Sequence, residues 1–201
     1  MSDDTKEKII AGAYRALVRG GYHATSVKDI AAEAGVAQGL VHYYFESKED
    51  LLVAAIEYGC GIEDSIAPLL ELPPIEAARW GFEWEKQQLR KRSELYVLVF
   101  DMFGVGLHNE RIAAAVRQYT GSRREVIAGI GRALAEQGAA PFGTTSDALA
   151  SVIWGSFVGI ALQKFTDPAF DADGALDALA DMVFSYVGLA SPMTTSQQGA
   201  V

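Results

Sequence analysis

Apolar residues recur at intervals of three and four along most of the chain, and this spacing predicts helices. No segment alternates apolar and polar residues over more than a few positions, so strands are not expected. Near the N-terminus the apolar positions form one face of a helix over residues 4–19, and Gly20-Gly21 ends it. The pattern predicts an all-α protein.

Three short helices are predicted next by their start and stop signals. Thr25 or Ser26 offers an N-cap for a helix that Gly35 ends. A third helix covers about residues 38–45, and a fourth, capped by Ser47, runs to about residue 66. The N-terminal part is therefore expected to be a compact group of short helices.

Longer helices are predicted over the rest of the chain. Pro74 is well placed to begin a helix through about residue 92. Others follow over residues 94–106, 110–137, 145–165 and 173–189, with loops at 138–143 and 167–168. The last segment is small and polar and is predicted to be disordered. The expected division is an N-terminal helical domain of residues 1–46, a larger helical domain of residues 47–190, and a tail of residues 191–201.

Two short helices joined by a tight turn at Gly35 are typical of a helix-turn-helix that reads DNA. Inner apolar positions can form a small core with the first helix: Ala13, Leu17, Val27, Ile30, Ala31, Val36, Val41 and Phe45. The outer side of the third helix then carries hydrogen-bonding and aromatic groups and a glycine, namely Gln38, Gly39, Leu40, His42 and Tyr43. A glycine inside a helix costs about 1 kcal/mol relative to alanine. Close approach to a duplex would explain it, and a frayed first turn is the alternative.

Residues 21–36, which read GYHATSVKDIAAEAGV, together with Gly39, Tyr44-Phe45, Lys48 and Leu51, resemble the TetR family of transcriptional regulators. The resemblance covers residues 6–55, and the rest of the chain matches only in its helical layout. It implies that the N-terminal domain binds DNA and that the larger domain binds an effector and forms a homodimer. The expected function is a repressor that a small molecule releases from a near-palindromic operator. The aromatic residues of the larger domain favour a hydrophobic or aromatic effector, and the single cysteine, which cannot form an internal disulfide, fits a cytoplasmic location.

The resemblance also assigns roles to residues of the helix-turn-helix. Gln38 would face adenine edges and Leu40 a thymine methyl group, while His42 and Tyr43 would reach bases or phosphates and Gly39 would permit close approach. Phosphate contacts that set the register are expected from Thr25, Ser26, Tyr44 and Lys48.

Two positions depart from the family pattern. The family usually has a tyrosine where this chain has His42, and a histidine there can add pH sensitivity near neutrality. The position before the third helix is often Ser or Thr and here is Ala37, which removes a helix cap at a cost of about 1 kcal/mol. Both changes bear on operator sequence and affinity, and neither affects the expected fold.

The net charge argues at first sight against nucleic acid as a partner. The 201 residues hold 17 Lys and Arg against 26 Asp and Glu, a formal net charge of −9. Residues 1–50 hold six basic and eight acidic groups, net −2, and the other 151 residues hold 11 basic and 18 acidic groups, net −7. The negative charge lies mainly outside the reading domain, but the third helix has no Arg or Lys. We therefore expect few ion pairs with phosphate and a shallow salt dependence of DNA binding.

Aromatic residues are dense in the larger domain, and they are either ordinary core or the lining of an apolar ligand cavity between helices. The candidates for ligand binding are Trp80, Trp84, Tyr96, Phe100, Phe103, Tyr119, Trp154 and Phe157.

The last two predicted helices are candidates for a four-helix dimer interface, with burial inside one subunit as the alternative. Gly155 and Gly159 would allow close approach of helices. The candidate interface residues are Leu149, Val152, Ile153, Ser156, Ile160, Leu179, Met182, Val183 and Tyr186. A two-fold dimer would present two reading helices to a near-palindromic site.

Other chemistry has weak support in the sequence. No phosphate-binding glycine loop or nucleophile motif is present, the histidines lack zinc spacing, and no cofactor, metal or catalytic site is expected. A site built from Asp101, His108 and Glu110, or a thiol sensor at Cys60, would be the exception.

No apolar run approaches 18 residues and the acidic N-terminus lacks an apolar core, so neither a membrane span nor a signal peptide is expected. The alternatives to an effector-responsive regulator are a helical carrier or enzyme that uses the helix-turn-helix as scaffold, and a DNA binder without an effector.

Overall fold

The computed structural model describes residues 2–63, 71–91, 93–138 and 144–189, and every regular element in these ranges is a helix. The predicted all-α fold is confirmed. The predicted tail, residues 191–201, lies outside the described residues. The chain forms two compact units, which contain different helices and are described separately.

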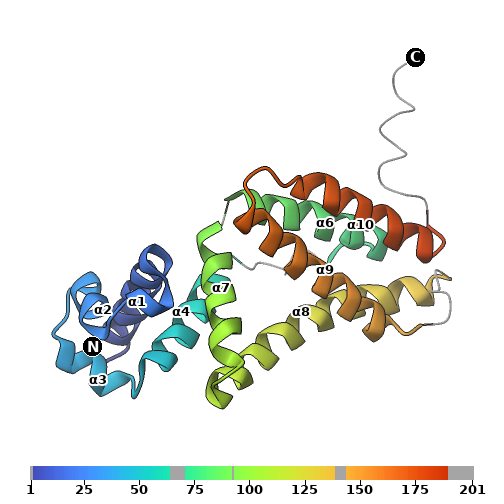
Figure 1. Ribbon diagram of the computed structural model, residues 1–201. Coiled ribbons are helices and arrows are strands. Elements are labelled where there is room, and N and C mark those ends of the chain that lie inside the picture. The colour runs from blue at the N-terminus through green and yellow to red at the C-terminus, as the bar shows by residue number, and fades with distance from the viewer. Residues whose placement is uncertain (1, 64–70, 92, 139–143, 190–201) are drawn as a thin grey trace. The chain divides into compact units, whose positions relative to one another are not determined.

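The first unit is built around α1 (Ser2–Ala24) (Figure 1). Three helices pack against it, α2 (Val27–Ala34), α4 (Lys48–Glu63) and α7 (Ser93–Gly106). The helix α3 (Gln38–Tyr44) packs on α2, and the beginning of α8 (Glu110–Glu136) completes the unit. Fully buried aliphatic side chains from five of these helices form its core: Ile9, Leu17, Ile30, Val41, Leu51, Leu52, Leu98 and Met102.

The predicted break at Gly20-Gly21 is present, although α1 continues past it to Ala24. Gly21 has a φ of 73° and a ψ of 164°, so the helix is kinked there. A positive φ strains residues with a side chain, and this explains a glycine at the kink. The chain turns at Gly21 because this position needs a positive φ, and the glycine in the sequence already indicated it.

The second unit contains α6 (Pro74–Lys91), the remainder of α8, α9 (Ser146–Thr166) and α10 (Ala172–Tyr186). Ion pairs join α6 to α10, one between Lys86 and Asp177 and one between Arg90 and Asp173, and their order shows that the two helices run antiparallel. Between the helices, the ring of Phe82 lies 5.5 Å from that of Phe157 and 6.2 Å from that of Phe184.

The compact units do not follow the predicted division after Glu46. Because α4 packs on α1 and on α7, it belongs to the first unit together with the three N-terminal helices. The predicted boundary at residue 46 lies shortly after α3, which ends at Tyr44 and carries the residues proposed to face base edges, and it remains a proposal about function.

One helix within the described ranges, α9, is long and apolar enough to cross a membrane by length and composition, with a mean hydropathy of 1.4 over 18 residues. No uninterrupted apolar run marks this helix in the sequence, because serines and glycines lie among its apolar residues. Core helices of proteins without a membrane span meet the same test, and Ala150, Ile153 and Phe157 of α9 are buried in the second unit.

Candidate DNA-reading surface and apolar cavity

The turn between α2 and α3 is defined by local hydrogen bonds. Ser26 caps α2 with a capping box: its hydroxyl accepts from the backbone N–H of Asp29 (3.2 Å), and the Asp29 carboxylate accepts from the backbone N–H of Ser26 (2.8 Å). At the other end Gly35 has a left-handed φ of 67°, and Val36 donates to the carbonyl of Ala31 (3.0 Å). These bonds set the direction in which α3 leaves the turn.

The predicted inner and outer faces of α3 are both observed. Val41 and Phe45 are buried beneath the helix, together with Ile30 and Ala31 of α2. On the opposite side the candidate DNA-reading residues are all exposed, namely Gln38, Gly39, Leu40, His42 and Tyr43. Tyr43 is 79% exposed and Leu40 is 42% exposed, which is unusual for such large apolar groups on a short helix.

The four predicted phosphate ligands lie in different settings. Ser26 is exposed and Tyr44 is half-buried with its ring against Tyr43. Thr25 is buried, and its hydroxyl is bonded to the carbonyl oxygens of Gly21 (2.8 Å) and Ala16 (3.2 Å), so it holds the kink of α1 and its proton is already used.

Lys48, the fourth of these residues, is half-buried. Its ammonium group donates to the carbonyl oxygen of Tyr22 and lies 4.2 Å from the centre of the Tyr22 ring. Burial lowers the pKa of Lys48, against the opposing effect of Glu49 and Asp101. In this position the side chain joins α4 to α1.

Several basic groups near the reading helix are paired with carboxylates of the same unit. Arg15 and Arg19 both bind Glu33 (3.0 and 2.9 Å), and these two arginines lower the pKa of that carboxyl. Arg111 binds Asp50 (2.6 Å). Pairing leaves fewer cations ready to meet phosphate, in line with the expected shallow salt dependence.

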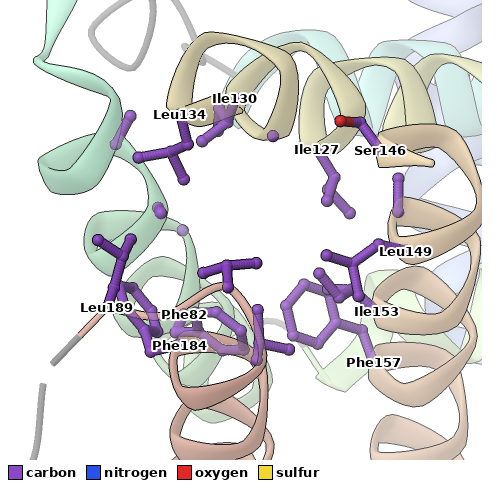
Figure 2. Close-up of a pocket in the computed structure, with 17 residues that line it drawn as sticks. Phe82, Ile127, Ile130, Leu134, Ser146, Leu149, Ile153, Phe157, Phe184 and Leu189 are labelled. Carbon is purple, nitrogen blue, oxygen red and sulfur yellow. The ribbon is translucent and has the colours of Figure 1, made fainter. Parts of the chain in front are cut away.

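The second unit contains an apolar cavity that is partly open to solvent and has a volume of about 90 Å³ (Figure 2). Its walls come from α6, α8, α9 and α10, with Leu189 following α10. Figure 2 shows aromatic and aliphatic side chains around the cavity and a single oxygen, the hydroxyl of Ser146. A cavity of this kind favours an apolar group and offers almost no hydrogen bonding to a polar one.

Only one of the predicted ligand-binding aromatic residues, Phe157, lines this cavity. Tyr96, Phe100 and Phe103 are on α7 of the first unit, where the Phe100 and Phe103 rings lie 6.2 Å apart. The others belong to the second unit but not to the cavity wall: Trp80 stacks on Trp84, and Tyr119 meets Trp154 edge to face.

The cavity residues missing from the sequence-based set are mostly aliphatic or small. On α8 they are Ile127, Ile130, Gly131 and Leu134, whose spacing of three and four marks one face of the helix. On α6 they include Phe82 and the small residues Ala77, Ala78 and Gly81. Small residues on one helix face are the signal that could have located the cavity.

Comparison with known proteins agrees with this geometry. Residues 9–55 match the family model described as bacterial regulatory proteins, tetR family. The matched segment contains the whole helix-turn-helix together with most of α1 and the start of α4. Residues 9–55 are therefore similar to the N-terminal domain of TetR-family regulators.

Relatives extend the comparison beyond the TetR-family domain. The chain is 30% identical over 105 residues to the uncharacterized HTH-type transcriptional regulator YerO of Bacillus subtilis, a match that covers 48% of this chain and 35% of that protein. The chain thus spans about a third of the length of this curated relative.

Two solved structures share the fold over nearly the whole chain. A TetR transcription regulator from Haloarcula marismortui has a TM-score of 0.76 at 21% identity, covering 92% of this chain and 97% of that one. FadR from Bacillus subtilis, in complex with stearoyl-CoA, has a TM-score of 0.71 at 18% identity, covering 92% and 100%. At these identities the likeness establishes the fold alone.

The predicted dimer residues divide into exposed and buried groups. Val152 of α9 and Met182 of α10 are each 62% exposed. Ile160 and Leu179 are buried, Ser156 and Tyr186 are half-buried, and the cavity wall includes Leu149, Ile153 and Val183. Val152 and Met182 are therefore open to solvent, whereas several of the other predicted dimer residues are used inside the subunit.

The remaining candidate groups have structural settings of their own. Asp101 accepts a hydrogen bond from the backbone N–H of Tyr22 (2.7 Å). His108 and Glu110 are exposed, and within the described ranges no three His, Cys, Asp or Glu side chains gather as a metal site would require. Cys60 lies on α4, but its side chain is outside the described residues.

Proposed function

We propose that this protein is a DNA-binding transcription regulator that acts as a repressor and responds to an apolar small molecule. The observation that carries the proposal is the outer face of α3. A helix of seven residues presents Gln38, Leu40, His42 and Tyr43 to solvent while its inner side is anchored in the core. Amide, imidazole, phenol and aliphatic groups on one helix suit the base edges of a major groove.

A near-palindromic operator and a homodimer belong to the same proposal. The exposed Val152 and Met182, with the glycines of α9, suit packing against a second copy of α9 and α10. A Cβ added at Gly155 or Gly159 would meet nothing within 4 Å, so these positions leave room for a close neighbour. We expect Met182→Glu to shift the protein to monomers in sedimentation; a dimer of unchanged stability would argue against this interface.

We expect the part of the effector that enters the cavity to be apolar. A cavity of about 150 Å³ accepts benzene, and this cavity of about 90 Å³ must widen for a ligand of that size. A slender hydrocarbon group with its polar end outside suits these walls better than a flat aromatic molecule. The stearoyl-CoA bound by FadR, which shares the fold, supports a long apolar effector.

Ligand response requires two conformations with different affinities for the effector and for DNA. An effector that binds more tightly to the conformation with misplaced reading helices lowers operator occupancy, and its difference in affinity sets the size of the effect. A mobility shift with and without a fatty acid of increasing chain length measures this coupling. Effector binding with unchanged operator affinity would instead favour a carrier.

The test of DNA binding uses duplexes from the region flanking the gene for this protein. We expect Gln38→Ala and Tyr43→Ala each to weaken specific binding by about tenfold, in the range for loss of one base contact. Leu107→Ala is the control, because Leu107 is 80% exposed but lies beyond the end of α7. Absence of specific binding by the wild-type protein at low salt would refute the proposal and favour a carrier or enzyme with the same fold.

A further inference from the structure

Gln38 and His42 lie one helical turn apart on the exposed face of α3, and their side chains touch. The amide nitrogen Nε2 of Gln38 is 3.4 Å from the ring nitrogen Nε2 of His42. With the amide in this orientation its nitrogen donates, and His42 accepts at Nε2 with its own proton on Nδ1. The imidazole therefore determines which end of the Gln38 amide faces it.

This contact decides what Gln38 presents to a base. With one amide hydrogen directed at His42, the side chain keeps its carbonyl oxygen and its second N–H for the groove. One acceptor and one donor match the N6 amino group and the N7 nitrogen of adenine. Guanine offers two acceptors in the same place, O6 and N7, and leaves the amide oxygen without a partner.

Protonation of His42 would reverse the arrangement. An imidazolium donates from both ring nitrogens and cannot accept a hydrogen bond. The amide must then turn its oxygen toward His42 and direct its NH₂ group outward. Two donors match guanine and oppose the N6 amino group of adenine. The two arrangements of the Gln38 amide therefore differ by one proton on the imidazole of His42.

We infer that His42 is a positioning residue that orients the Gln38 amide, so that the protein reads adenine at one operator position above neutrality and guanine when His42 is protonated. The inference rests on the proposed DNA-binding function and assigns specificity within it. This inference gives the histidine one turn after Gln38 a role other than contacting a phosphate.

Charged groups near α3 come from α2, from α1 and from the residue after α3. The charged side chains of α2 are Lys28, Asp29 and Glu33, and from α1 the ammonium of Lys6 lies 6.0 Å from the centre of the Phe45 ring. Asp29 is engaged by Ser26, and Glu33 by Arg15 and Arg19. Lys28 is exposed, and Glu46, beyond the end of α3, pairs with Arg111 (3.6 Å). Among the described contacts, that of His42 is with Gln38.

The experiment is selection of binding sites from a randomised duplex library with the full-length protein at pH 8.0 and pH 5.5. Gln38→Ala first identifies the position that Gln38 reads, as the one whose preference disappears. At that position we expect the wild-type protein to favour adenine at pH 8.0 by about 5- to 150-fold, the range for one bidentate contact, and to shift toward guanine at pH 5.5.

His42→Phe keeps a ring of similar size and removes both nitrogens. We expect it to weaken the adenine preference at pH 8.0 and to abolish the pH shift, with its fold checked by circular dichroism. His23→Phe is the matched control, since His23 is also an exposed histidine of the first unit but lies on α1, and it should retain the shift.

The outcomes separate the inference from the function on which it rests. If the wild-type protein selects a motif but His42→Phe keeps both the adenine preference and the pH shift, or if the base at the Gln38 position does not change with pH, the inference is wrong while DNA binding stands. If the wild-type protein selects no motif at either pH, the proposed function fails and the inference with it.

Discussion

Tyr22 joins three helices of the first unit through separate groups. Its backbone N–H donates to Asp101 of α7 (2.7 Å), its hydroxyl donates to Glu49 of α4 (3.0 Å), and Lys48 lies over its ring. All of this occurs directly after the kink at Gly21. A single buried tyrosine at the end of α1 thus joins α4 and α7 to α1.

Tyr22 should make the stability of the protein sensitive to alkaline pH. Burial, with the hydrogen bond to Glu49, raises its pKa from 10.0 to about 12. A raised pKa means that the folded state retains the proton longer than the unfolded state, so the related stability is complete below pH 10 and declines between pH 10 and 12. We expect Tyr22→Phe to be less stable by about 1 kcal/mol at pH 8 and to lack this part of the decline, as measured by urea unfolding at several pH values. Equal declines in Tyr22→Phe and wild type would contradict the assignment.

Gly39 distinguishes a requirement of DNA binding from a requirement of folding. A Cβ at this position would meet nothing within 4 Å, so nothing in the described part of the protein demands a glycine. We expect Gly39→Ala to stabilise the protein by up to about 1 kcal/mol and to weaken operator binding, because the methyl group would stand between α3 and the duplex. Denaturation and fluorescence anisotropy measure the two effects. Unchanged DNA affinity would show that Gly39 belongs only to a frayed first turn.

At the scale of helices, the cavity depends on small residues at contact positions. Gly81 of α6 lines it, and a Cβ there would meet nothing within 4 Å. The helices remain apart at this point because neighbouring large residues, such as Phe82 and Phe184, set their spacing. An unfilled apolar volume lowers stability unless a ligand occupies it, which is consistent with a binding role.

Filling the cavity should separate effector binding from DNA binding. We expect Gly81→Leu to abolish binding of fatty-acid probes, followed by tryptophan fluorescence, while operator affinity is retained and stability does not fall. Gly121→Leu is the control, since Gly121 of α8 is also a helical glycine with open space around it but is not among the cavity residues. Equal loss of probe binding in both variants would place the effector elsewhere.

At the scale of the whole molecule, the charge distribution determines how strongly the affinity for DNA depends on salt. The net charge is −9, and several cations of the first unit are engaged by carboxylates. We expect a plot of log affinity for the operator against log salt concentration to have a slope much shallower than the value of about −10 known for strongly ionic repressors. Lys28→Ala should reduce the slope if this exposed lysine meets a phosphate. A steep slope would mean that the ion pairs of the free protein open on DNA.

The sequence by itself determined the features that depend on neighbouring residues. The helix-turn-helix, the cap at Ser26, the break at Gly21 and the outer face of α3 all follow from periodicity and from the local conformations that serine and glycine favour. These signals act over one or two helical turns, so they can be found without knowing the tertiary structure.

Only the tertiary structure decided which apolar residues enclose the cavity and which polar groups are already engaged. Aromatic density favoured Tyr96, Phe100 and Phe103, which lie in the first unit, whereas the cavity uses aliphatic and small residues of four other helical segments. Thr25 and Lys48 have the residue types of phosphate ligands but bond to backbone carbonyls near the kink. Whether a side chain faces a core, a cavity or solvent depends on partners far along the chain, and helical periodicity specifies a face without specifying what covers it.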